Sequence, residues 1–343
     1  MHNLLSADIE PTGSEPYLAC MNNHRLLDLL RKRAHQLQFS LIDASDGGCS
    51  IEPSPQHNKS KTAILLQTSA TNGATSSFWG SAIGLDFMNH AAAYHAGNTL
   101  RFIFHTSCEE STEQLVAAGC FADIARVIIV DSHYSVPAGA IGLQNRTILP
   151  AMLQFTIELE TKSNSLLNLN GTARRIATLL SQLPTRRIDA LTPVQISFAE
   201  LYISEEGKAR LQGSIQSSTI KTLAVIWEEI KKLLVKMEKL LGLSMQIVKN
   251  MSRAEIETDP LLNTPISKHI RQAAGIEKLI ELEHLNSDYT NLGLVLSKAR
   301  STAVYHPYLN DVQHLGDPAQ LREFWQNSIL PFTACFNSIL KKY

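Results

Sequence analysis

The sequence predicts an α/β fold in which a mostly parallel sheet is flanked by helices and a smaller α+β domain is inserted. Its 343 residues are enough for two domains of about 100–200 residues each. Short apolar segments alternate with helical segments between residues 63 and 130, and strands connected in this way pair in parallel. After Gly142 the pattern changes to longer strands in which apolar and polar residues alternate.

The first 150 residues supply most of the elements of the larger domain. Residues 23–38 have leucines at helical spacing and predict an amphipathic helix, whereas residues 43–61 are rich in glycine, proline and polar residues and predict a loop. The alternation that follows predicts three strands and two helices. The strands are 63–66, 100–104 and 126–130, and the helices are 83–95 and 111–118.

Residues 151–260 predict the inserted α+β domain. Three segments read as strands, and a long leucine-rich helix ends before Gly242. The predicted strands are 153–159, 194–203 and 209–215, and the helices are 171–183 and 223–241. Residues 261–343, with helices at 266–274 and 318–340, then complete the larger domain, so that domain consists of residues 1–150 and 261–343.

The composition excludes several classes of protein. The 31 Lys+Arg and 32 Asp+Glu residues nearly cancel, which argues against a nucleic-acid surface. With 44% hydrophobic residues the chain is not disordered, and no apolar run approaches the roughly 18 residues that a membrane span needs. The five cysteines include no C-x-x-C pair, and no signal-peptide pattern follows Met1. We therefore expect a cytoplasmic protein whose partner is a small molecule.

Chemically active side chains follow the predicted parallel strands. The ligand crevice of such sheets lies beyond the carboxyl ends of the strands. Two glutamates, two histidines, an aspartate and a cysteine fall there, and they are His105, Cys108, Glu109, Glu110, Asp131 and His133. Of these, His105, Cys108 and Asp131 are candidates for contacts with a substrate. The alternative for Cys108 is a buried, unreactive thiol.

Residues 100–144 resemble the zinc aminoacylases, acetylornithine deacetylases and carboxypeptidase G metallopeptidases, above all the amino-acid-conjugate amidohydrolases. That branch reads R-F-I-F-Q-P-A-E-E, then an alanine-glycine helix end, G-L-H and V-G-T-V-G. This chain has Arg101-Phe-Ile-Phe-His-Thr-Ser-Cys-Glu-Glu110, then Ala117-Ala-Gly119, Val127-Ile-Ile-Val-Asp-Ser-His133 and Pro137-Ala-Gly-Ala-Ile-Gly142. More weakly, the resemblance extends from about residue 60 to the end, where His306-Pro307-Tyr308 matches a late H-x-P-x-F segment.

The resemblance implies a zinc-exopeptidase-like fold, a lid or dimerisation domain, a homodimer and a small amino-acid-derived substrate. In that family two metal ions activate a water molecule, and a glutamate acts as general base. Carried over to this chain, Glu109 is the general acid/base. The implied metal ligands are Glu110, His133 and His306.

Several positions depart from the family pattern. Where the family has its first cysteine and histidine ligands, this chain has Gly80 and Ala82, and the acidic residues of the preceding strand are absent from residues 67–72. No histidine occurs at residues 162–165, where the family places its lid histidine. Two hypotheses follow. One is a divergent amidohydrolase with one divalent ion (zinc, manganese or cobalt) or none; the other is a pseudoenzyme that binds a small molecule or a protein. A metal-free, repurposed enzyme lies between them.

Overall fold

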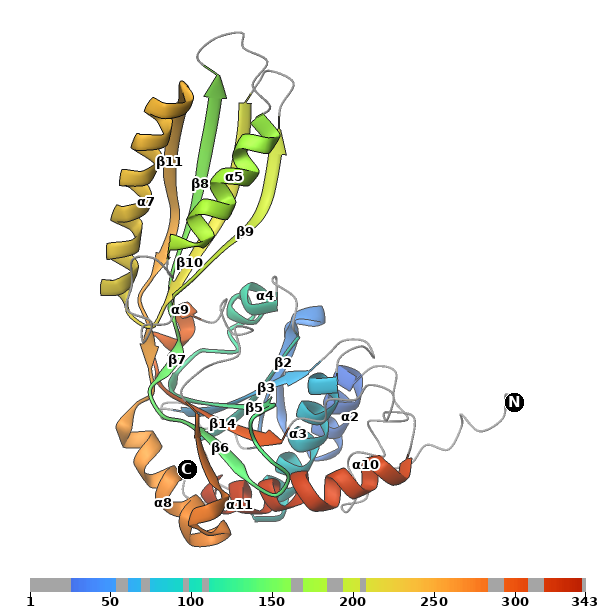
Figure 1. Cartoon of the computed structure of the whole chain (residues 1–343). Helices are drawn as coiled ribbons and strands as arrows, with labels where there is room; N and C mark the ends of the chain where they lie inside the picture. Colours follow the sequence, from blue (N-terminus) through green and yellow to red (C-terminus); the bar gives the residue numbers. More distant parts are fainter. Residues whose placement is uncertain are drawn as a thin grey trace. The chain divides into compact units, whose positions relative to one another are not determined.

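The computed structural model describes residues 26–53, 61–68, 75–94, 99–106, 111–161, 169–183, 194–203, 208–282, 293–307 and 318–340. The chain divides into two compact units (Figure 1). Unit 1 consists of Met1–Ile148 and Glu257–Tyr343, and unit 2 is Leu149–Ile256. No helix in the described ranges is both long enough and apolar enough to cross a membrane.

Unit 1 contains the helices α2 (Leu26–Gln36), α3 (Thr75–Tyr94), α4 (Ser111–Ala117), α8 (Pro260–Ala274), α9 (Gly293–Leu296), α10 (Pro318–Phe324) and α11 (Leu330–Leu340). Its sheet strands are β1 (Ser40–Asp43), β2 (Gly48–Glu52), β3 (Lys61–Thr68), β4 (Leu100–Thr106), β5 (Ile124–His133), β6 (Ile141–Gln144), β13 (Leu279–Leu282) and β14 (Arg300–Pro307). A π-helical turn, Trp325–Ile329, joins α10 to α11.

Within the described residues, the sheet of unit 1 has eight strands in the order β1-β2-β4-β3-β5-β14-β6-β13. Its centre is parallel, because β3 pairs in parallel with both β4 and β5, and β5 pairs in parallel with β14. The antiparallel pairs β1–β2, β2–β4 and β14–β6 lie to either side. The predicted fold class, a mostly parallel sheet flanked by helices, is confirmed.

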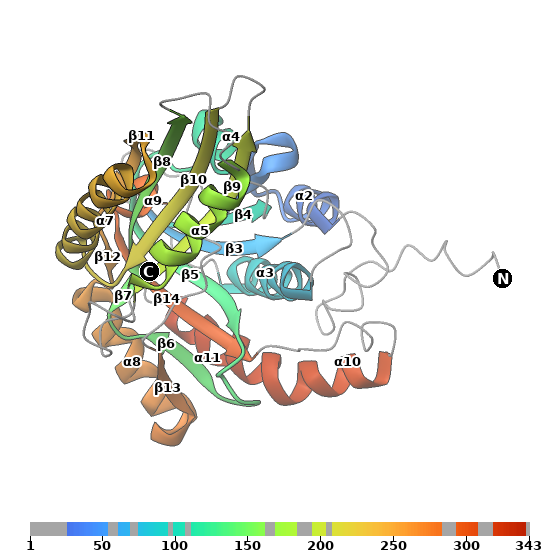
Figure 2. The same cartoon turned by 45° about the horizontal axis from the view of Figure 1, so that its top comes forward.

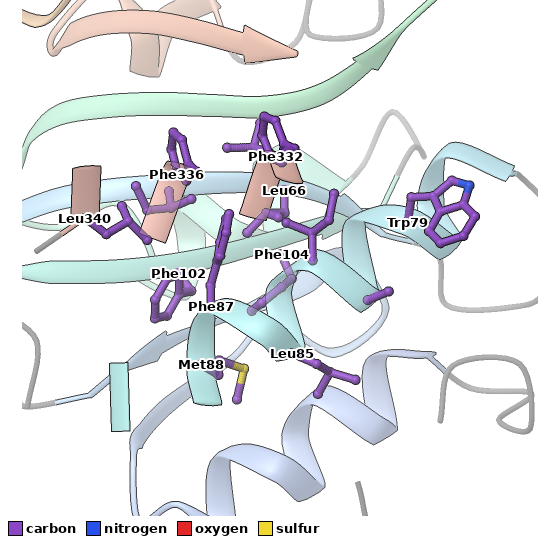
Figure 3. Close-up of a cluster of buried hydrophobic side chains, with 14 of the residues drawn as sticks. Leu66, Trp79, Leu85, Phe87, Met88, Phe102, Phe104, Phe332, Phe336 and Leu340 are labelled. Atoms are coloured by element: carbon purple, nitrogen blue, oxygen red, sulfur yellow. The ribbon is translucent and has the colours of Figure 1, made fainter. Parts of the chain in front are cut away.

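A large apolar core covers one face of this sheet. Leu66 and Phe104 project from β3 and β4 toward Phe87 of α3 and Phe336 of α11 (Figure 3). The rings of Phe87 and Phe336 are 5.1 Å apart, so α3 and α11 pack against each other as well as against the sheet. Helix α2 packs beside α3 (Figures 1 and 2). Every one of these side chains is almost fully buried, which identifies this layer as the main stabilising core of unit 1.

In its described residues, unit 2 has an antiparallel sheet with two helices on one face. The strand order is β11-β8-β10-β9 in the described residues. The strands are β8 (Ala151–Thr161), β9 (Val194–Ile203), β10 (Lys208–Ser217) and β11 (Leu243–Arg253), and the helices are α5 (Leu169–Ser181) and α7 (Ile220–Leu241). Alternate residues of the strands, such as Phe155 and Ile157, pack against α5 and α7 in one apolar cluster. Two short strands, β7 (Thr147–Leu149) and β12 (Ile256–Glu257), pair where the chain passes between the units.

The structure corrects two expected local elements. The loop predicted over residues 43–61 contains β2, whose residues are all buried. Cys49 and Ile51 of β2 pack in the core, and the strand pairs with β4. The alternation of apolar and polar residues in β2 is short and follows two glycines, which favour a loop in a sequence-based prediction. The helix predicted at 83–95 begins earlier, at Thr75, and therefore contains Gly80. Glycine is favoured there because a Cβ at Gly80 would overlap the carbonyl oxygen of Gln67, so its absence lets α3 approach β3.

Candidate functional site

Two rows of buried polar residues cross the carboxyl ends of the parallel strands. On β3, β4, β5 and β14, the last apolar residue before these rows, such as Leu66 or Val130, faces the apolar core. Because side chains alternate along a strand, the next residues face away from that core. This first polar row consists of Gln67, His105, Asp131 and Tyr305, and the register pairs Gln67 with His105 and Asp131 with Tyr305. The second polar row, on the core face, consists of Thr68, Thr106, Ser132 and His306.

Tyr305 is the most deeply buried member of the first polar row, with no exposed surface. Burial raises the pKa of its phenol, and the nearby Asp131 carboxylate raises it further. The hydroxyl oxygen has no hydrogen-bond partner in the part of the chain that the structure describes. Gly142 lies opposite Tyr305 on β6, where a Cβ would crowd the Cβ of Tyr305. The glycine on β6 therefore leaves room for the side chain of Tyr305, whose hydroxyl group has no hydrogen-bond partner among the described residues.

His133 ends β5, on the same face as Asp131 and two residues after it. Its ring contacts the Tyr305 ring edge-on, with centroids 5.5 Å apart, and stacks on Tyr134 at 4.6 Å. The backbone N–H of Ser135 donates a hydrogen bond to Nδ1 of His133 at 3.1 Å. Burial lowers the pKa of His133, which favours the neutral ring. This hydrogen bond therefore assigns the remaining proton to Nε2.

His306 belongs to the second polar row and contacts a different part of the molecule. Its ring lies 5.6 Å from the ring of Phe332 on α11, inside the apolar core. Nδ1 donates to the carbonyl oxygen of Pro307 at 2.9 Å, and burial lowers the pKa of His306 to about 4. The register places His306 beside Ser132 and Pro307 beside His133. His306 and His133 consequently face opposite sides of the sheet.

His105 lies in the first polar row, on β4. It is buried, its Nδ1 donates to the Thr106 carbonyl oxygen at 3.2 Å, and burial lowers its pKa to about 4. Asp131 is also buried, and its Oδ1 accepts a hydrogen bond from the backbone N–H of Ser132 at 2.7 Å. The first polar row therefore combines neutral imidazole, carboxylate and phenol groups.

Of the residues predicted for the site, the structure brings Asp131 and His133 together and places His105 in the same row. It does not bring His306 to them. Cys108, Glu109 and Glu110 lie outside the described residues. Tyr305 was not among the predicted site residues, although it directly precedes His306. Strand alternation would have found it once residues 300–307 were assigned as a strand, since it must face the side opposite to His306.

The described residues do not fit a bound metal ion. They contain no group of three His, Cys, Asp or Glu side chains arranged to hold one. His133 and His306 face opposite sides of the sheet, and Nδ1 of His133 already accepts a hydrogen bond. A histidine that binds a metal usually donates its other ring N–H to a carbonyl or carboxylate oxygen, as His306 does here and His133 does not.

No family model matches the chain, and no curated protein matches its sequence. Solved structures, in contrast, match its fold. A dinuclear metal-binding peptidase of the M20 family from Bacillus subtilis has a TM-score of 0.65 at 13% identity, over 96% of this chain and 99% of that one. A protein from methicillin-resistant Staphylococcus aureus, described as an aminohydrolase, has a TM-score of 0.64 at 13% identity, over 83% and 82%.

An amidase of the hydantoinase/carbamoylase family from Burkholderia phymatum has a TM-score of 0.56 at 11% identity, over 92% of this chain and 90% of that one. These matches span most of both chains, so the chain has the fold of M20-type peptidases, aminohydrolases and amidases. Identities of 11–13% establish the fold alone. Function depends on the residues of the site rather than on the fold.

Proposed function

We propose that the chain hydrolyses or otherwise processes an amide-type bond in a small amino-acid derivative. The observation that carries this proposal is the buried first polar row at the carboxyl ends of the parallel strands, in a chain with an amidase-type fold. The resemblance of residues 100–144 to amino-acid-conjugate amidohydrolases supports it. A small substrate also fits the nearly balanced charge of the chain.

In this proposal Glu109 is the general acid/base. It follows the end of β4 by three residues in sequence, and His105 is on that strand. Its carboxylate removes a proton from a water molecule as the water oxygen attacks the acyl carbon. The same carboxyl group then gives the proton to the amine nitrogen as the C–N bond breaks. The products are a carboxylic acid and an amine.

The resemblance assigns Glu110, His133 and His306 to a metal ion, but the described residues do not fit one. No step of the proposed reaction is therefore routed through a metal. Metal content is a separate measurement. Elemental analysis of protein purified without chelators, after addition of zinc, manganese or cobalt, tests the assignment. Less than one bound ion per chain at every concentration would reject the metal-dependent form of the proposal.

The test of the reaction is a Glu109→Gln variant assayed against a panel of N-acylated amino acids. We expect turnover by the unmodified chain and its loss in the variant, since glutamine cannot accept the proton. The matched control is Glu113→Gln, which removes an exposed carboxylate from α4. Turnover that survives Glu109→Gln would exclude Glu109 as the acid/base.

The second candidate function is a binding protein that keeps the fold without catalysis. The separation of His133 and His306 on opposite faces of the sheet favours it over a metallohydrolase. It predicts that members of the same panel bind to the chain without being turned over. The homodimer and the cytoplasmic location remain predictions from the sequence.

A further inference from the structure

Asp131, His133 and Tyr305 form a compact group on one face of the sheet, which we call the Tyr305 cluster. Asp131 and Tyr305 are direct partners in the parallel pairing of β5 with β14. The ring centroids of His133 and Tyr305 are 5.5 Å apart, at an interplanar angle of 67°. All three side chains are buried, at 5%, 5% and 0% exposed. The cluster therefore holds three neighbouring polar groups on one face of the sheet, shielded from bulk solvent.

Two members of the cluster are neutral hydrogen-bond donors. A tyrosine hydroxyl keeps its proton at neutral pH, and that of Tyr305 has no hydrogen-bond partner among the described residues. His133 accepts at Nδ1 from the Ser135 N–H, so its neutral ring donates through Nε2. A buried donor without an acceptor costs free energy. A ligand oxygen that accepts its hydrogen bond would remove this cost. The edge-on ring contact places the two donor-bearing rings next to each other on one face of the sheet.

The third member is an acceptor. One oxygen of Asp131 accepts the Ser132 N–H at 2.7 Å, and a carboxylate offers about four acceptor directions in total. An anionic ligand would be repelled by this charge at low dielectric. A neutral ligand group with an acceptor and a donor on adjacent atoms complements the cluster. An amide is such a group.

We infer that the Tyr305 cluster binds a neutral amide group without a metal ion: Tyr305 and His133 donate to its carbonyl oxygen, and Asp131 accepts from its N–H. This inference rests on the proposed function for its substrate class and names the residues that recognise the amide. It assigns to His133 a role opposite to that of a metal ligand, because a metal requires the lone pair of a ring nitrogen. Binding requires no turnover, so the inference can be tested before any reaction is found.

The first experiment measures the tautomer of His133 by ¹⁵N NMR of histidine-labelled protein, with His133→Gln to assign its signals. We expect a protonated Nε2 and an unprotonated Nδ1, and no change in either when zinc chloride is added. A zinc-dependent shift of the His133 nitrogens would overturn the inference and make His133 a metal ligand. An Nδ1–H tautomer would also overturn it.

The second experiment titrates the same protein with N-acetylglycinamide, a neutral amide, and with acetate, a carboxylate that has no amide N–H. We expect the amide, and not acetate, to shift the His133 signals. Tyr305→Phe is expected to weaken amide binding roughly 5- to 10-fold, the effect of losing one hydrogen bond. A response to acetate alone, or to neither compound, would overturn the inference.

The thermal stability of Tyr305→Phe separates recognition from a purely structural role. Phenylalanine keeps the ring in its packing position and removes only the unsatisfied hydroxyl, so the melting temperature without ligand is expected to stay the same or rise. A fall in melting temperature with unchanged amide binding would make Tyr305 a structural residue. Failure of the proposed hydrolysis would leave these measurements unaffected, because none of them uses turnover.

Discussion

Glu52 and Lys61 form a buried ion pair between β2 and β3. Nζ of Lys61 donates to both carboxylate oxygens of Glu52, at 2.8 and 3.0 Å. Arg101 of β4 contacts the same carboxylate and also donates to the carbonyl oxygens of Cys120 and Ala122, at 2.8 and 2.9 Å. One carboxylate thus faces two cations, and all three side chains are at most 7% exposed. Among the described residues, Glu52 is the carboxylate that pairs with both cations, so the arrangement depends on it.

Glu52→Ala is therefore expected to destabilise the chain strongly. It leaves two buried cations without a counter-charge, and breaking a buried pair in this way costs about 3–5 kcal/mol. Urea unfolding followed by circular dichroism measures the change. The control is Glu158→Ala, which breaks an exposed pair with Arg210 and is expected to cost about 1 kcal/mol or less. Similar losses in both variants would contradict the buried network.

Gly80→Ala tests the close approach of α3 to β3. The new Cβ would overlap the backbone carbonyl oxygen of Gln67, so helix and strand must separate, and we expect a loss of about 2–3 kcal/mol. The comparison is Gly84→Ala, one turn later, where the new Cβ meets the side chain of Phe104 rather than backbone. That variant is expected to lose less, since a ring can tilt. An equal or smaller loss for Gly80→Ala would show that α3 shifts freely.

The parallel centre of the sheet was predictable because β3, β4 and β5 are short apolar runs between helices. Strand β14 was harder to predict, because it is buried on both faces yet contains Ser301 and Thr302. The structure satisfies these polar groups individually: the hydroxyl of Thr302, for example, donates to Asn263 at 2.7 Å. The hydrogen-bond partner of Thr302 is far away in the sequence, on α8, so the residues around Thr302 do not indicate that this polar side chain belongs to a buried strand.

The same limit applies to the site. The sequence places Asp131 and His133 at a strand end, and two-residue spacing already puts both on one face. Neither spacing nor motif resemblance gives the register of β14 against β5, which separates His306 from His133 and pairs Tyr305 with Asp131. A shift of one residue would exchange Tyr305 and His306 between the faces. Whether Tyr305 or His306 shares a face with Asp131 and His133 therefore depends on how β14 pairs with β5 in the folded protein.

Asp86 is expected to make the chain less stable as the pH rises. It lies on α3, where Nδ2 of Asn337 donates to its Oδ2 at 2.9 Å, and burial raises its pKa above the ordinary 3.8. The folded state thus holds the proton more tightly than the unfolded state. The associated stability is complete below pH 3.8 and declines as the pH rises through the folded pKa. Urea unfolding of the unmodified chain and of Asp86→Asn between pH 3 and pH 7 should show this decline as the difference between the two unfolding free energies.

His105 and His306 are expected to have the opposite effect. Burial lowers the pKa of each from 6.5 to about 4, so the unfolded state binds more protons between these values. Each histidine then contributes stability on the order of 3 kcal/mol above pH 6.5, which is lost as the pH falls toward 4. His306→Gln should flatten the acid side of the pH profile, whereas His35→Gln, at an exposed position of α2, should leave it unchanged. Because the Asp86 and histidine effects overlap in pH and have opposite signs, the unmodified chain shows only their sum. An acid profile that is unaltered by His306→Gln would mean that this ring reaches solvent in the folded protein.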